Sequence, residues 1–109
     1  MFFYIFIIRD WIMELEIKNE NGTLMIKIIG KIDTMTAPKL EEEISKNFDG
    51  VSEVIFNFEE VKYISSSGIR VLVGTSKKVN NNMKILKPTN EVMEVFTITG
   101  LATKFNIEK

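Results

Sequence analysis

The chain has 109 residues and a net charge of −1, with 45% hydrophobic and 27% charged residues, the balance of one globular domain. It contains no histidine and no cysteine, which excludes disulfides, thiolate metal sites and Ser-His-Asp catalysis. Its lysines and arginines form no run, so we expect no nucleic-acid partner. No phosphate-binding P-loop string occurs, and we expect no cofactor, no metal and no catalytic residue.

The first eight residues are the apolar run MFFYIFII, which Arg9 and Asp10 end. This run is too short for a membrane-spanning helix and lacks the features of a secretory signal, so we expect no membrane partner. Three interpretations stay open. In the first, residues 1–12 are an extension upstream of a true start at Met13. In the second, they are an added strand or a hydrophobic arm that packs on the domain or on a second copy. In the third, they are an interfacial membrane anchor helped by Trp11. We assign residues 13–109 to the domain.

An opening β-hairpin is predicted next. Leu15 and Ile17 alternate with charged residues, as in a half-exposed strand. Asn21-Gly22 favours a two-residue hairpin turn, because both residues tolerate positive φ. The second strand spans residues 24–29, and we expect Gly30 to end it.

The rest of the chain alternates helices and strands. Thr36 is predicted to cap a first helix that has Pro38 in its first turn. The later elements are a strand over 51–58, a helix over 67–79, a strand over 83–86, a helix from residue 89 or 90 to Gly100, and a short extended end. The prediction is a single α/β domain, with a mixed sheet of four to five strands and three to four helices, in which βαβ crossovers follow the hairpin.

The segment Ser65-Ser66-Ser67-Gly68 lies where a buried strand is followed by a helix. Unpaired backbone N–H groups at a helix N-terminus favour negative charge. One of these serines is therefore either a helix cap or the acceptor of a phosphate. Because the chain has no histidine to activate a serine, any modification here is carried out by another protein.

Two groups of acidic residues are also candidates for a functional role. Asp33 follows the second hairpin strand and is either a turn or cap residue, or an acidic group near the serine loop, because adjacent parallel strands end at the same edge of a sheet. Residues 41–43 are three glutamates that point about 100° apart on a helix, so we interpret them as a solvated face that cannot converge on a metal.

In several ordered segments the chain resembles the STAS family, the sulfate transporter and anti-sigma-factor antagonist domains. The resemblance covers residues 13–109. It rests on Gly30-Lys31-Ile32-Asp33, on Thr36-Ala37-Pro38, on the segment from Tyr63 to Leu72, and on Val95-Phe96 with Thr99-Gly100-Leu101. Two positions differ from the family pattern: Ser65 stands where an aspartate is expected, and Lys31 replaces an acid.

This resemblance implies an anti-sigma-factor antagonist that is not an enzyme and that acts in the cytoplasm by partner switching. It implies phosphorylation of Ser66 by an anti-sigma factor that is a serine-protein kinase, with a PP2C-type phosphatase as a further partner. The implied partner-contacting residues are Asp33, Ser65, Ser67, Gly68, Ile69 and Arg70. The alternative is a STAS subunit that is not phosphorylated and docks in a transporter or signalling complex.

Overall fold

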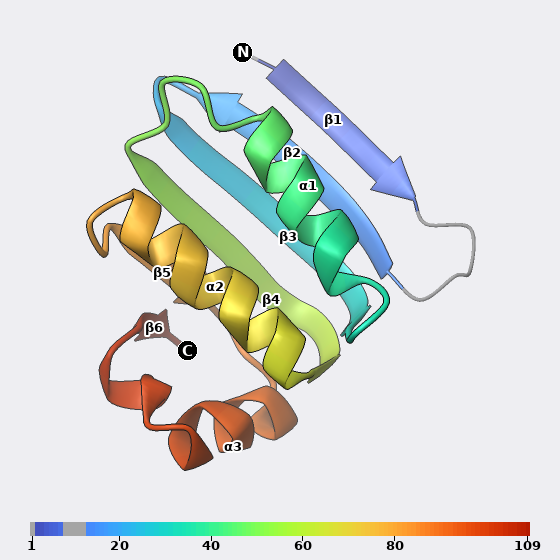
Figure 1. The fold of residues 1–109 in the computed structure, drawn as a ribbon, viewed down its shortest axis with the longest axis vertical. Coiled ribbons are helices and arrows are strands. Elements are labelled where there is room, and N and C mark those ends of the chain that lie inside the picture. Colours follow the sequence, from blue (N-terminus) through green and yellow to red (C-terminus); the bar gives the residue numbers. More distant parts are fainter. Residues whose placement is uncertain (1, 8–12) are drawn as a thin grey trace.

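The computed structural model describes residues 2–7 and 13–109, and for residues 2–7 it describes the backbone (Figure 1). Its elements, in chain order, are β1 (Phe2–Ile7), β2 (Met13–Glu20), β3 (Thr23–Ile32), α1 (Ala37–Lys46), β4 (Glu53–Ile64), α2 (Ser66–Lys78), β5 (Met83–Leu86), α3 (Asn90–Ile98), the 3-10 turn η1 (Leu101–Thr103) and β6 (Asn106–Glu108).

The strands form one mixed sheet in the order β1-β2-β3-β4-β5-β6. The pairs β1–β2 and β2–β3 are antiparallel, and β3 to β6 are parallel. The predicted α/β class, mixed sheet and opening hairpin are confirmed. The described sheet has six strands rather than four to five, because the apolar start adds β1 at one edge.

The hairpin forms where the sequence predicts it. Asn21 has φ 53° and Gly22 φ 86°, and Glu20 pairs with Thr23 across the turn. The expectation that Gly30 ends the second strand is wrong. Gly30 has φ 112° and lies at a shift in the β3–β4 register, so it makes a bulge, and β3 continues to Ile32.

The core lies between the helices and one face of the sheet. Figure 1 shows α1 and α2 lying across the same face. Side chains of β3 alternate, so that Leu24, Ile26 and Ile28 are buried while Met25 is exposed. Helix α3 packs on β4 with the Phe96 and Phe58 ring centroids 6.2 Å apart.

None of the helices in the described ranges, 2–7 and 13–109, has both the length and the apolar character that crossing a bilayer requires. The proposed anchoring role of Trp11 lies outside the described residues.

Candidate functional site

The carboxyl ends of β3 and β4 bring two candidate loops together. Ile32 and Ile64 are opposite one another in the parallel ladder, and the Ser65 N–H donates to the Ile32 carbonyl at 2.8 Å. Asp33 and Ser65 follow these two residues directly. The prediction that both loops leave the same edge of the sheet is confirmed.

Ser65 is the N-cap of α2. Its backbone is extended, with φ −90° and ψ 174°, and its Oγ accepts a hydrogen bond from the Gly68 N–H at 3.2 Å. Where the STAS resemblance leads us to expect an aspartate, Ser65 thus keeps the acceptor that starts the helix but carries no charge. Of the two roles open to the serines, the cap belongs to Ser65.

Ser66 is the first residue of α2 and is exposed, whereas Ser67 is half-buried. The Ser66 hydroxyl makes no hydrogen bond to any residue that the structure describes. The backbone N–H groups of the first helical turn lie beside it, and they favour an anion. Arg70 is exposed four residues further along α2, the spacing at which helical side chains meet.

Asp33 caps α1. Its Oδ1 accepts hydrogen bonds from the N–H groups of Met35 at 2.9 Å and Thr36 at 3.0 Å. The Thr36 hydroxyl accepts from the Asp33 N–H at 2.8 Å and donates to the Lys31 carbonyl at 2.9 Å. Thr36 is the N-cap residue of α1, as predicted, but it makes no side-chain cap bond, because its hydroxyl holds the backbone of the preceding loop instead.

These contacts set the charge state of Asp33. Partial burial raises the pKa of its carboxyl, but the hydrogen bonds from Thr36 and Met35 and the positive charge of Lys31 outweigh burial, and the pKa is lowered. Asp33 is therefore a fixed negative charge at neutral pH, on the loop beside the serine loop.

Gly68 is buried beneath the serine loop. A Cβ placed on it would lie 2.7 Å from Ile32 Cγ2 and 2.7 Å from Ile64 Cγ1. Only glycine lets the first turn of α2 approach the ends of β3 and β4 this closely. Ile69 next to it is half-buried and packs against the core.

Sequence reasoning missed two exposed hydrophobic side chains beside these loops. Met35, in the Asp33 loop, is 69% exposed, and Tyr63, two residues before Ser65, is 48% exposed. The only signal for Met35 was an apolar residue between two threonines in a predicted turn.

A third helix also begins at this edge. Thr89 is the N-cap of α3 and accepts from the Val92 N–H at 3.3 Å, while its hydroxyl donates to the Val61 carbonyl of β4 at 3.2 Å. The caps of α1, α2 and α3 thus all lie near the carboxyl ends of the parallel strands.

The interpretation of the three glutamates needs one correction. Glu41 and Glu42 are exposed, but Glu43 is only 3% exposed, and its Oε2 lies 3.4 Å from the Lys46 ammonium group. Glu43 faces inward because it follows Leu40 by three residues, on the buried stripe of α1.

Comparison with known proteins gives consistent matches. The family model for the STAS domain matches residues 14–109. An anti-sigma-B factor antagonist of Staphylococcus aureus (strain NCTC 8325 / PS 47) is 31% identical over 101 residues, which cover 89% of this chain and 94% of that protein.

Solved structures share the fold. The anti-sigma factor antagonist SpoIIAA in its unphosphorylated form has a TM-score of 0.76 at 23% identity, covering 87% of this chain and 88% of that one. SpoIIAA of Bacillus in the phosphorylated form has a TM-score of 0.68 at 23% identity, covering 87% and 91%. An anti-sigma factor antagonist from Mycobacterium paratuberculosis has a TM-score of 0.78 at 21% identity, covering 94% and 90%.

Proposed function

Since this chain belongs to the STAS domain family, we propose that it is an anti-sigma factor antagonist whose switch is the phosphorylation of Ser66. In its unmodified form it binds an anti-sigma factor and thereby frees a sigma factor. The observation that carries the proposal is the exposed Ser66 hydroxyl at the first residue of α2, with its neighbour Ser65 already engaged as the cap.

The proposed contact surface is the edge formed by the Asp33 loop and the start of α2. Ser65 precedes Ser66 as the N-cap, and Ser67, Ile69 and Arg70 follow it within the next four residues of α2. Arg70 is exposed, and Asp33 supplies a fixed negative charge on the adjacent loop.

Gly68 lies beneath this surface, and its missing side chain lets the first turn of α2 pack closely on Ile32 and Ile64. Met35 and Tyr63 add exposed apolar area beside these loops, and large side chains of this kind are frequent anchors at protein interfaces.

Phosphorylation acts on binding more than on folding. A phosphate adds about −1.5 to −2 charges, and a helix N-terminus favours that charge by about 0.3–1 kcal/mol. The fold therefore tolerates the modification. The same charge, placed in a close contact with an acidic partner surface, weakens the complex about tenfold for each 1.4 kcal/mol of repulsion.

The protein acts as a binding switch and not as a catalyst in this proposal. Its anti-sigma factor is also the serine-protein kinase that modifies Ser66, and a PP2C-type phosphatase reverses the modification. Its place of action is the cytoplasm, where sigma factors direct transcription.

The test is phosphorylation by the cognate anti-sigma factor with ATP. The wild-type chain should gain one phosphate, mapped to Ser66 by mass spectrometry. Ser66→Ala should gain none, and the matched variant Ser67→Ala should still gain one. Full phosphorylation of Ser66→Ala would refute the assignment.

A further inference from the structure

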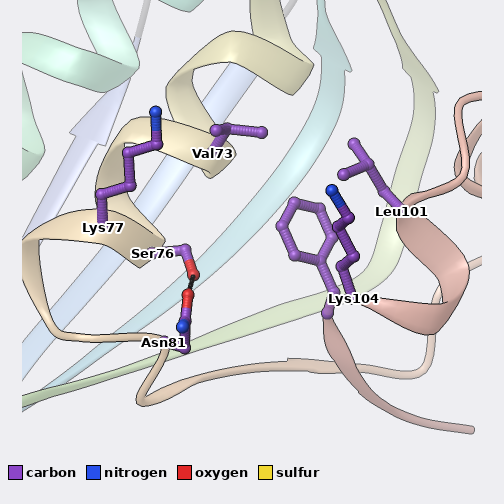
Figure 2. A pocket seen from close by; sticks show the side chains of 7 residues that line it. Val73, Ser76, Lys77, Asn81, Leu101 and Lys104 are labelled. Atoms are coloured by element: carbon purple, nitrogen blue, oxygen red, sulfur yellow. Dashed lines mark hydrogen bonds between the residues drawn. The ribbon is translucent and has the colours of Figure 1, made fainter.

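A pocket of about 430 Å³ lies between the second half of α2 and the segment that follows α3. Figure 2 shows its walls: Val73 and Lys77 come from α2, and Leu101 and Lys104 from η1 and the residue after it. Its volume is within the range of small-molecule sites. The pocket lies along α2 away from Ser66, so it is separate from the proposed switch.

The interior of the pocket is apolar. Val73 and Leu101 are half-buried and Phe105 is 9% exposed. Phe105 is held in place by Phe96 of α3, whose ring centroid lies 5.6 Å away at an interplanar angle of 88°. The apolar lining is therefore preformed and anchored to the core.

Positive charge flanks this interior from both sides. Lys77 and Lys104 are exposed and extend from opposite walls (Figure 2). Within the described ranges of the chain, no carboxylate lies within salt-bridge distance of either ammonium group. Two cations without a protein counter-ion beside an apolar lining match a ligand with a carboxylate and an apolar body.

A polar pair, the buried Ser76 and the exposed Asn81, completes the pocket. Ser76 is 9% exposed, and its hydroxyl donates to Asn81 Oδ1 at 3.1 Å. Asn81 adopts φ 66°, and its backbone N–H donates to the Ser76 carbonyl at 2.8 Å, which fixes the loop after α2. The Ser76 oxygen and the Asn81 amide N–H₂ keep hydrogen-bonding capacity for an oxygen of a ligand.

We propose that this pocket binds a small carboxylic acid with an apolar body, such as a medium-chain fatty acid. The carboxylate lies between Lys77 and Lys104, and the hydrocarbon chain contacts Val73, Leu101 and Phe105. The two ammonium charges exceed the roughly half negative charge at the carboxyl end of α2, so an anion is favoured there.

The test uses octanoate as the probe in an NMR titration of the ¹⁵N-labelled full chain. Shifts should be confined to residues 73–81 and 101–105. Hexanoate should bind more weakly than octanoate, by about threefold to fourfold for each methylene removed. Neutral octan-1-ol should bind at least tenfold more weakly than octanoate.

The charge requirement is tested with the double variant Lys77→Gln/Lys104→Gln, which should bind octanoate at least tenfold more weakly. The matched control Lys39→Gln/Lys62→Gln removes two exposed lysines outside the pocket and should bind like wild type. The proposal is overturned if octan-1-ol binds as tightly as octanoate, if the pocket variant binds like the control, or if no shift appears at these residues up to about 10 mM octanoate.

Discussion

The backbone N–H of Ser65 donates to the carbonyl of Ile32 at 2.8 Å, and this one bond ties the serine loop to the strand that leads into Asp33. The bond is the last rung of the parallel β3–β4 ladder, so the sheet itself sets the distance between the two loops. A partner that contacts both loops therefore meets a preformed surface and orders little on binding.

Replacing Ser66 with aspartate or glutamate should block binding to the anti-sigma factor while the fold is kept. Ser66 is exposed at a helix N-terminus, where an acidic side chain stabilises the helix by about 0.3–1 kcal/mol. Circular dichroism and a pull-down on the same sample measure both effects. Unfolding of either variant would contradict the view that the switch acts only at the surface.

Replacing Gly68 with alanine should destabilise the fold by about 1–3 kcal/mol, because the new Cβ would lie 2.7 Å from each of two buried isoleucines. Gly74 on the same helix is the matched control. A Cβ there meets nothing within 4 Å, so Gly74→Ala should stabilise the chain by about 0.5–1 kcal/mol. Urea unfolding of both variants is the measurement, and equal shifts in the same direction would contradict the packing argument.

The cap of α2 can be tested at Ser65. Ser65→Ala removes the acceptor of the Gly68 N–H bond and should cost about 0.5–2 kcal/mol of the free energy of unfolding. Ser65→Asp restores the residue type of the family and should keep the stability of the wild type. A Ser65→Ala variant that unfolds at the wild-type urea concentration would show that the bond contributes nothing.

The free energy of unfolding should decrease in acid because the Asp33 carboxylate becomes protonated. Its carboxyl pKa is lower in the folded chain than in the unfolded one, which is about 3.9. The stabilisation is therefore complete above the unfolded pKa and is lost as the pH falls through the folded pKa.

Asp33→Asn keeps a capping oxygen, so it should be nearly as stable as wild type at pH 7 but lose less stability between pH 5 and about 2. Asp33→Ala should be less stable at pH 7 by about 0.5–2 kcal/mol. The measurement is the urea unfolding midpoint of each variant across this pH range. If the midpoints of wild type and Asp33→Asn fall equally with pH, Asp33 is excluded as the titrating group.

A chain that begins at Met13 should bind the anti-sigma factor as tightly as the full chain. The family match begins at residue 14, and within the described sheet β1 is an edge strand paired with β2, whereas the proposed contact loops follow β3 and β4. Calorimetric titration of both chains compares the affinities. Weaker binding by the shorter chain would give residues 1–12 a part in the interface, and a change from dimer to monomer in light scattering would make them an assembly arm.

Local patterns in the sequence predicted most of the fold because each has a direct physical cause. Asn21-Gly22 predicted the hairpin turn, and the helix start predicted at residue 89 or 90 agrees with α3, whose N-cap is Thr89. Gly30 was misinterpreted, because a glycine in a strand marks either its end or a bulge, and only the pairing partner distinguishes these. Glu43 was assigned to solvent because its burial depends on how α1 is rotated against the sheet.

At the candidate site, the sequence predicted where the loops lie, but not which serine caps the helix or which residues are buried. Three consecutive serines look alike in a sequence, and the extended backbone of Ser65 is what makes it the cap. The burial of Gly68 depends on Ile32, which is distant in the chain, so it could not be predicted from the local motif.

Because α1, α2 and α3 all begin at the same edge of the sheet, their helix dipoles add up there. Each helix N-terminus is equivalent to roughly +0.5 elementary charge, so the starts of α1, α2 and α3 together present about +1.5 to anything that approaches. One phosphate carries about −1.5 to −2. A single modification at Ser66 therefore offsets the positive charge of all three helix starts, beside the negative charge that Asp33 already carries. We expect the proposed phosphorylation to weaken the attraction of an acidic partner surface to this edge.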